Sequence, residues 1–352
     1  MGRRPWQKVL TAAKALPVLA LLHVALPAYA QTPPKMEIQL FSSEFGGVFY
    51  LIGQGFSELI NKNCPWLASG SLETHGSIDN VKREADIPEK RARTLRGVTA
   101  SVVWPAKLGQ APLFDKKYDL KMLFTFGIAF SVFATTDPNI KTVNDFKGKK
   151  VGVGDKGSSF NSEVRFMLQD CTNIWDTIKP EWLSHVPASN AFMDGMIDVM
   201  YTPVFYFGGD KFMIHPQTAE ALRMKKVYLL GITAEELEQG KKKTGWPASR
   251  IVMPAGALPE RVNRDQPILS WVNTLGYGAY ADMDEKVAYE IVKIAHQNML
   301  KFAGFHACTK VMSPEVMAWL PVASEQDVHP GALKYYKEQG IKISVGGRSP
   351  LN

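Results

Sequence analysis

The chain has 352 residues, of which 45% are hydrophobic and 21% charged, and its formal net charge is +7. A chain of this length can bury a large core and is expected to form two domains rather than one. The first thirty residues hold four of the 41 basic residues and no acidic one, which leaves 37 basic against 34 acidic residues in the remainder. So small an excess does not suggest nucleic-acid binding.

The N-terminus has the features of an export signal. A basic start is followed by an apolar stretch over residues 15–28 and by the small-residue end Ala28-Tyr29-Ala30, an order typical of secretory signal peptides. We expect cleavage after Ala30 and a mature periplasmic protein that begins at Gln31. A membrane anchor is the alternative, and it is disfavoured because the apolar run is too short to span a bilayer. The arginine pair near the start leaves twin-arginine export open.

The three cysteines, Cys64, Cys171 and Cys308, would enter an oxidising compartment on export. They can form at most one internal bridge. Cys171 falls on the apolar face of a predicted helix, so we expect it to be a small core residue. CxxC, HExxH and GxSxG motifs are absent, and His306 with Cys308 is too sparse for a metal site. No catalytic residue, metal or cofactor is expected.

Several turns between a predicted strand and a predicted helix could hold a ligand. A strand over residues 37–41 leads through SSEFGG to a helix that starts at Val48, and a polar turn at residues 73–80 leads to a helix near Ser77. Pro88 is expected to stop this second helix early. Residues 97–104 follow as a strand, and two further strands lie between residues 121 and 135.

The turn at residues 155–159 is the strongest of these candidates. A strand over residues 151–154 precedes it, and an apolar helix face follows it. Gly154 and Gly157 let the backbone approach a bound group, and Ser158 or Ser159 can cap the helix, whose first N–H groups carry partial positive charge. Without a ligand, the same residues would make a plain tight turn. They also match Gly-x-Gly-x-x-Gly from Gly152, with an acidic residue about 20 positions on, as in a dinucleotide site.

The remaining elements continue to alternate between strand and helix. Predicted helices cover residues 192–197, 234–244, 284–302 and 330–340, and predicted strands cover residues 198–201, 227–231 and 250–254. This alternation predicts an α/β fold with mainly parallel sheets flanked by helices. The aromatic residues Tyr201, Phe205, Tyr206 and Phe207 could line a cleft or fill a core, and packing in a core is favoured.

Five segments, in this order, resemble the TAXI family of solute receptors, which serve tripartite ATP-independent periplasmic (TRAP) transporters. They are FGGVFY (residues 45–50), GSIDNV (76–81), IKTVNDFKGKKVGVGDKGSS (140–159), DGMIDVMY (194–201) and HPGALKYYKEQGI (329–341). The resemblance implies a two-lobed, type II-like periplasmic binding-protein fold that holds one small solute in the cleft between its lobes. A receptor of this family is no enzyme, and it hands its solute to TRAP membrane permease subunits.

The resemblance also implies an approximate division of the chain. Lobe I would comprise residues 31–129 and 278–352, and lobe II residues 130–277, closing about strands near residues 130–135 and 274–282. We expect the protein to be a monomer. A nicotinamide-dependent oxidoreductase that uses the Gly152–Gly157 loop is the alternative, disfavoured by the export signal and by the position of the loop far inside the chain. A periplasmic sensor subunit for the same solute is a further alternative.

The expected ligand-binding residues come from the turns and from aromatic residues at the predicted strand ends. They are Ser43, Glu44, Phe45, Gly46, Gly47, Tyr50, His75, Ser77, Trp104, Gly157, Ser158, Ser159, Phe160 and Tyr201. Glu44, Phe45 and Phe160 replace the small or hydroxylated residues common in the family, and Trp104 replaces a polar one. The pocket should therefore be more aromatic than a glutamate-type site, with an acidic side chain at its edge. We expect an aromatic or flat organic acid, with an amino acid as the alternative.

Overall fold

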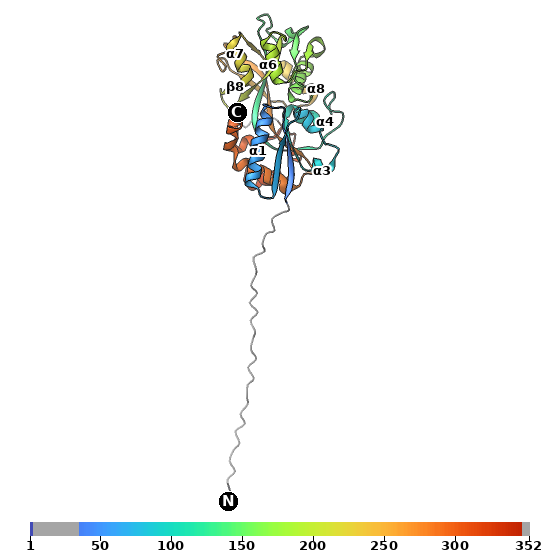
Figure 1. The fold of residues 1–352 in the computed structure, drawn as a ribbon, viewed down its shortest axis with the longest axis vertical. Helices are drawn as coiled ribbons and strands as arrows, with labels where there is room; N and C mark the ends of the chain where they lie inside the picture. The colour runs from blue at the N-terminus through green and yellow to red at the C-terminus, as the bar shows by residue number, and fades with distance from the viewer. Residues whose placement is uncertain (3–34, 347–352) are drawn as a thin grey trace. The chain divides into compact units, whose positions relative to one another are not determined.

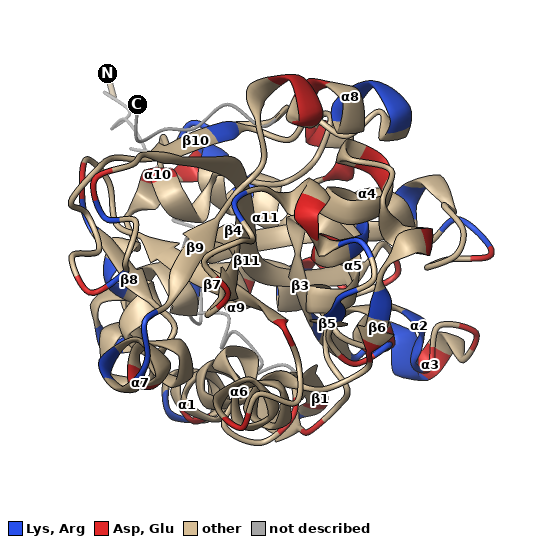
Figure 2. Ribbon diagram, turned by 90° about the horizontal axis from the view of Figure 1, so that it is seen from above, with Lys and Arg blue, Asp and Glu red and all other residues tan. Residues whose placement is uncertain are grey.

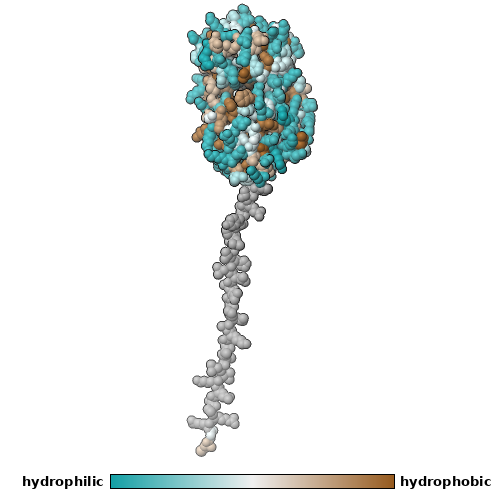
Figure 3. Space-filling model, in the orientation of Figure 1, coloured by the Kyte–Doolittle hydropathy of each residue, from teal (hydrophilic) through white to brown (hydrophobic). Residues whose placement is uncertain are grey.

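The computed structural model describes residues 1–2 and 35–346 (Figure 1). The expected export signal and its cleavage after Ala30 lie outside these residues, so both stay predictions. None of the described helices is both long and apolar enough to cross a membrane. Figure 3 shows a largely hydrophilic face on which the hydrophobic residues form small separate patches.

The described residues contain one sheet of eleven strands, whose main order is β2-β1-β3-β11-β4-β7-β5-β6. The strands are β1 (Met36–Phe41), β2 (Leu67–Leu72), β3 (Thr94–Thr99), β4 (Leu120–Thr135), β5 (Lys150–Gly152), β6 (Lys179–Glu181), β7 (Val199–Tyr206), β8 (Phe212–Ile214), β9 (Tyr228–Leu230), β10 (Arg250–Met253) and β11 (Ile268–Tyr280). At one end β1 pairs in parallel with β2 and β3, and at the other β5 pairs in parallel with β6 and β7. In the middle, β11 and β4 run antiparallel to each other and to their outer neighbours. The predicted α/β class is confirmed, and the parallel pairing holds at the two ends of the sheet.

Helices flank the sheet at both ends (Figure 1). They are α1 (Val48–Asn63), α2 (Ser77–Lys82), α3 (Pro88–Arg91), α4 (Ala100–Leu108), α5 (Ser159–Arg165), α6 (His185–Met193), α7 (Pro216–Met224), α8 (Ala234–Thr244), α9 (Glu285–Gln297), α10 (Pro314–Met317) and α11 (Pro330–Glu338). A π-helical segment, η2 (Phe166–Cys171), continues α5 directly. Short 3-10 helices are η1 (Val143–Phe146), η3 (Trp175–Thr177), η4 (Met299–Gly304), η5 (Ala307–Val311) and η6 (Glu325–Asp327).

The helix α1 shows how the apolar pattern positions one of these elements. Phe49, Ile52, Phe56 and Ile60 recur at helical spacing, and all four are buried. Each such side chain contributes about 1.5 to 3 kcal/mol by leaving water. The helix ends at Asn63, shortly before Pro65 in the sequence. Because these four side chains are buried, the packing of α1 fixes its N-terminus beyond the end of β1.

The prediction for residues 97–104 was wrong. The strand β3 ends at Thr99, and residues 100–108 form α4, which contains Trp104 and Pro105. All residues from Ala100 to Ala106 are buried, so the helix has no polar face that could show a helical period. Pro105 cannot donate to the carbonyl of Ser101, and that carbonyl instead accepts a hydrogen bond from Ser162 Oγ at 2.5 Å.

Other predicted boundaries also changed. Residues 120–135 form the single long strand β4 rather than two strands, and it is buried along nearly its whole length. The helix predicted over residues 192–197 begins earlier, as α6. Pro88 does not end α2, which stops at Lys82; it is instead the first residue of α3, where its missing N–H costs nothing.

Buried residues form separate cores at the two ends of the sheet. The largest contains residues from before Phe130 and after Val272, together with Phe205. Two others consist of residues between Ala100 and Trp271. In Figure 1, α1, α3 and α4 accordingly lie in one half of the molecule, and α6, α7 and α8 in the other. The strands β4 and β11 contribute to cores in both halves.

The three cysteines are buried and unpaired. Cys171 is a core residue, as predicted from its place on the apolar helix face.

Candidate functional site

A cavity of about 380 Å³ lies where residues from both halves of the sheet meet. Its size falls within the range of small-molecule sites. The lining residues are Ser43, Glu44, Phe45, Gly46, Gly47, Val48, Phe49, Glu73, His75, Gly76, Ser77, Thr99, Ala129, Ser158, Ser159, Phe160, Glu163, Ser184, His185, Val186, Pro187, Pro203, Phe205, His215, Gln217, Asn273 and Leu275.

Six of the described helices begin at this cavity. Their N-cap residues, all in the lining, are Gly47 (α1), Gly76 (α2), Thr99 (α4), Ser158 (α5), Ser184 (α6) and His215 (α7). Two of these N-caps are glycines, and the side chains of the other four accept no hydrogen bond from their own helix. In α1 and α4, first-turn N–H groups instead donate to Ser43 Oγ and Asn273 Oδ1. The first N–H groups of a helix carry partial positive charge and attract anions or hydrogen-bond acceptors. The backbone therefore contributes partial positive charge to the cavity.

The turn between β1 and α1 is fastened at both ends. Ser43 Oγ accepts a hydrogen bond from the backbone N–H of Tyr50 at 3.1 Å, and Glu73 Oε1 accepts one from the N–H of Phe45 at 2.9 Å. The ring of Phe45 is 74% exposed. Its edge-to-face contact with Tyr50 has a centroid distance of 5.2 Å. Phe45 thus lies at the mouth of the cavity.

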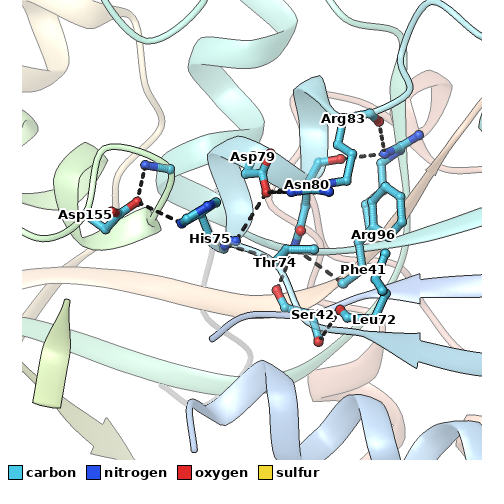
Figure 4. A network of polar contacts seen from close by, with 12 residues as sticks. Phe41, Ser42, Leu72, Thr74, His75, Asp79, Asn80, Arg83, Arg96 and Asp155 are labelled. Atoms are coloured by element: carbon cyan, nitrogen blue, oxygen red, sulfur yellow. Dashed lines mark hydrogen bonds and ion pairs between the residues drawn. The ribbon is translucent and has the colours of Figure 1, made fainter. Parts of the chain in front are cut away.

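A buried network fixes α2 against the strand ends (Figure 4). Asn80 Nδ2 donates to the carbonyls of Ser42 and Gly97 at 2.7 and 2.8 Å. Arg96 Nη1 donates to the carbonyls of Asn80 and Arg83, and its guanidinium lies 4.5 Å from the ring centroid of Tyr280. Burial lowers the pKa of Arg96 to about 10, so it remains charged at neutral pH. These bonds position the turn between β1 and α1 and the turn before α2. Neither Asn80 nor Arg96 lines the cavity.

The turn at residues 155–158 is packed against α2. Its Gly157 carbonyl accepts hydrogen bonds from the N–H groups of Ile78 and Asp79, at 2.9 and 3.1 Å. His75 Nδ1 lies 3.7 Å from Asp155 Oδ1, as Figure 4 shows. A Cβ on Gly157 would lie 2.6 Å from the Cβ of His75, so only glycine allows this approach. Because the turn is engaged by α2, it is not free to wrap around a pyrophosphate.

A buried carboxyl group faces the cavity from α5. Glu163 is 2% exposed, and its Oε2 accepts hydrogen bonds from Ser131 Oγ at 2.8 Å and from the hydroxyl of Tyr201. Burial raises the pKa of Glu163, against the opposing effect of hydrogen bonds from Tyr201, Ser131, Asn273 and Ser159. Burial also raises the pKa of Tyr201, which keeps its phenol a donor.

Two histidines contact each other on the opposite wall. The ring centroids of His185, the first residue of α6, and His215, which caps α7, are 4.0 Å apart. Their exposures are 7% and 6%. Both ring nitrogens of His185 and Nδ1 of His215 lack a hydrogen-bond partner among the described residues. Burial lowers the pKa of His185 to about 4, and burial followed by the neighbouring His185 and His306 lowers that of His215.

The lining residues, all of them described, include no Lys or Arg. Their carboxyl groups belong to Glu44, Glu73 and Glu163. Figure 2 shows basic and acidic residues interspersed over the ribbon. No Lys or Arg side chain of the wall therefore adds to the partial positive charge of the helix N-termini. Among the described residues, no group of three or more His, Cys, Asp or Glu side chains could hold a metal ion.

Ten of the residues proposed from the sequence lie in the lining. They are Ser43, Glu44, Phe45, Gly46, Gly47, His75, Ser77, Ser158, Ser159 and Phe160. The other four, Tyr50, Trp104, Gly157 and Tyr201, lie behind it or beside it. Tyr201 packs behind Phe160, at a centroid distance of 5.0 Å. Trp104 was expected at a strand end, but it is only 7% exposed within α4 and packs on Trp246 at 5.8 Å.

Sequence reasoning missed the histidine pair and Glu163. A local signal existed for His215, because Pro216 follows it and proline is typical of the first helical position. Ser184 likewise precedes His185 as an N-cap type of residue. Glu163 falls within a predicted helix, but nothing in the sequence marks it as buried.

Taken together, the fold and the cavity define an α/β protein whose helix N-termini surround a space for a small molecule. The chain belongs to the NMT1-like family, whose sequence pattern matches residues 42–340. Similar solved structures include MatC from Rhodopseudomonas palustris with bound malate, at 12% identity and a TM-score of 0.49, covering 87% of this chain and 96% of that one. The periplasmic aliphatic sulphonate binding protein SsuA from Escherichia coli is 15% identical, with a TM-score of 0.42, covering 90% and 96% of the two chains. A TctC solute binding protein from Polaromonas is 14% identical, with a TM-score of 0.41 and coverages of 89% and 91%.

Proposed function

We propose that this protein is a periplasmic receptor of the TAXI type, which captures a small organic acid without transforming it and delivers it to TRAP membrane permease subunits. One observation carries the proposal: six helices begin at the cavity, so the partial positive charges of their N-termini gather there. Such groups of N–H donors suit a carboxylate or sulfonate. The five sequence segments that resemble the TAXI family support the choice of transporter.

The lining also favours an acid with a flat body. Phe45, Phe160 and Phe205 contribute aromatic surface to the cavity. A stacked or edge-on ring contributes about 0.5 to 1.5 kcal/mol beyond its buried area, so two such contacts favour a planar solute by about fivefold to a hundredfold. The wall has no basic side chain, which disfavours an acid with two or more negative charges. An aromatic or otherwise planar monoanion fits best.

Capture would occur by closure of two lobes. The separate cores before Phe130 and after Val272, and between Ala100 and Trp271, are consistent with a division near residues 129 and 277. The strands β4 and β11 would then be the hinges, because they contribute to cores in both halves. The hydrogen bonds from Ile78 and Asp79 to Gly157 would hold the lobes together in the closed state. Solution scattering should show compaction on adding a solute, and unchanged dimensions at saturation would contradict closure.

The first test is a thermal-shift screen of residues 31–352 with organic acids, amino acids and small aromatics. A ligand that binds only the folded state raises the melting temperature. At a concentration 100 times its Kd it adds about 2.7 kcal/mol to the free energy of unfolding. We expect monoanionic acids to give the largest shifts. A screen in which amines stabilise the protein and no acid does would overturn the proposed function.

The choice of permease needs a separate test. We expect the saturated receptor to support solute uptake into proteoliposomes that contain TRAP membrane subunits encoded beside its gene, in the presence of an ion gradient. Uptake that is independent of the receptor, or a requirement for ATP, would reject the TRAP assignment and leave solute binding in place.

A further inference from the structure

The side chains that line the cavity offer no Lys or Arg charge to offset a bound anion. Three carboxyl groups contribute to its wall, and no Lys or Arg does so among the lining residues. Helix N-termini supply only partial positive charges. A bound monoanion next to the buried Glu163 would therefore leave the site with excess negative charge in a poorly solvated space, which is costly.

His185 and His215 are placed where a protonated ring could offset the negative charge of a bound acid. They lie at the starts of α6 and α7, two helices of nine residues each, and both residues line the cavity. Their unpartnered nitrogens can donate or accept once an acid arrives. A buried polar group without a partner costs free energy unless a ligand satisfies it. The rings therefore belong to the binding site and are not merely packed in a core.

We propose that the cavity binds a monoanionic acid together with one proton, and that the His185–His215 pair holds this proton against the bound anion. The inference rests on the proposed function and specifies its ligand. The proton comes from solvent: a neutral imidazole and a free carboxylate become an imidazolium that donates its N–H to the bound carboxylate. The net charge of the filled site then equals that of the empty one.

The geometry limits uptake to one proton. In the empty protein both rings are neutral, because burial lowers the pKa of each and the rings repel each other's positive charge. A nearby carboxylate favours the charged ring. With centroids 4.0 Å apart, however, two imidazolium rings would repel strongly, so the second stays neutral.

Other titratable groups around the pair must be separated from it by experiment. His306 faces His215 from η5, and its ring centroid lies 5.4 Å from that of Phe205. From α5 and β7 come Glu163 and its donor Tyr201, and Glu44, Glu73 and His75 lie in the same lining. Glu163 is the serious competitor, since an incoming anion could protonate this carboxyl group instead of a histidine.

Calorimetry in buffers of different ionisation enthalpy counts the protons directly. The probes are benzoate as a flat monoanion, pyruvate as a small one, malonate as a dianion and benzamide as the uncharged analogue of benzoate. At pH 6.5 we expect a bound monoanion to carry about one proton and benzamide none. Between pH 5 and the pH at which the complex loses its proton, the affinity for the acid should fall about tenfold per pH unit.

Matched variants assign the proton to a residue. The double variant His185→Gln/His215→Gln should abolish proton uptake and weaken binding of the acid, with little effect on benzamide, whereas each single variant leaves one ring that can hold the proton. Glu163→Gln should keep the uptake of one proton. His296→Gln is the control, because that ring bonds Tyr335 and lies outside the lining; it too should keep the proton.

Different outcomes contradict the proton inference and the proposed function. Acid binding with no proton taken up, or uptake that survives in the double histidine variant, overturns the inference alone. Loss of the proton in Glu163→Gln assigns it to the carboxyl group and also overturns the inference. If no acid in the wider screen binds, the proposed function fails as well.

Discussion

Helices that begin at the cavity and helices that begin elsewhere differ in how their first turns are completed. Away from the cavity, Thr233 caps α8, Asp284 caps α9, Ser313 caps α10 and His329 caps α11, each by accepting a backbone N–H of its own helix. Among the described α-helices that begin outside the lining, only the one-turn helix α3 lacks such a cap. At the cavity, two of the six N-caps are glycines, and the side chains of the other four accept no such bond.

The capped helix starts contribute to stability, whereas some of the helix starts at the cavity are available for binding. A side-chain cap is typically worth about 1 kcal/mol, and the helices at the cavity begin without it. The helix α8 shows the opposite arrangement, with acidic residues in its first turn and lysines in its last, as Figure 2 shows. Such charges stabilise a helix by complementing its dipole. Because Ser43, Asn273 and Gly157 already accept first-turn N–H groups of α1, α4 and α2, we infer that the first turns of α5, α6 and α7 are the ones kept for a ligand.

The largest expected effect is a loss of stability on changing a residue in the body of α4, away from its N-terminus at the cavity. Trp104 lies in α4 but outside the lining and packs on Trp246. Trp104→Ala should therefore lower the free energy of unfolding by about 3 to 5 kcal/mol. The affinity for benzoate should stay unchanged. Urea unfolding and calorimetry measure the two quantities, and a stable variant with lost affinity would return Trp104 to the pocket.

A second prediction concerns pH and the histidine at the start of α6. The folded-state pKa of His185 is about 4, below its ordinary value, so the folded protein binds fewer protons than the unfolded chain between the two values. Its contribution to stability is complete above about pH 6.5 and is lost as pH falls towards 4. His185→Gln should thus gain stability relative to the unmodified protein on acidification, by up to about 1.4 kcal/mol per pH unit.

The measurement is urea unfolding of both proteins without ligand, at pH 5 and pH 7.5. His296→Gln is the comparison: burial also lowers the pKa of that ring, but the ring is less buried and already bonds Tyr335, so we expect the same trend to be smaller. A difference between the two proteins that does not change with pH would show that His185 is not held neutral in the cavity.

The sequence predicted the turns better than the walls between them. The glycines and serines of residues 42–47 and 155–159 have local conformational and capping roles, so a strand-to-helix turn at each place could be predicted. The ends of α8 were also predictable, because Thr233 and Gly245 mark them. These features depend on neighbours in the chain and need no knowledge of the fold.

The features that sequence reasoning missed depend on tertiary contacts. The helix α4 is buried all round and resembles a strand in sequence, and its proline is tolerated because Ser162 occupies the carbonyl that the proline leaves free. The contact between His185 and His215 joins residues 30 positions apart through the packing of α6 and α7. Nothing local could predict that contact or the burial of Glu163.

A third prediction places a charge at one uncapped N-terminus. Ser158→Glu should weaken binding of benzoate by at least about tenfold, since a carboxylate there repels the anion and competes for the same N–H groups. Folding should be preserved, because an acidic residue at a helix start is favourable. The affinity for benzamide should change much less. Equal losses for the two ligands would indicate a steric effect rather than an electrostatic one.

The smallest predicted effects test the comparison between the two kinds of helix start directly. Thr233 Oγ1 accepts a hydrogen bond from the N–H of Glu236 at 3.1 Å, and Glu236 Oε2 accepts one from the N–H of Thr233 at 2.8 Å. Thr233→Ala should therefore cost about 1 kcal/mol of stability and leave binding unchanged. Ser184 is the N-cap of α6, lines the cavity and makes no side-chain bond to its helix.

Ser184→Ala should accordingly leave stability nearly unchanged and reduce the affinity for benzoate severalfold, if its hydroxyl donates to the acid. Chemical denaturation and calorimetry on both variants give four numbers, and the comparison predicts a crossed pattern: stability lost in one variant, affinity in the other. A stability loss of about 1 kcal/mol in Ser184→Ala would mean that its hydroxyl caps α6 in the absence of ligand. The N–H groups at the cavity would then not be held free for a solute.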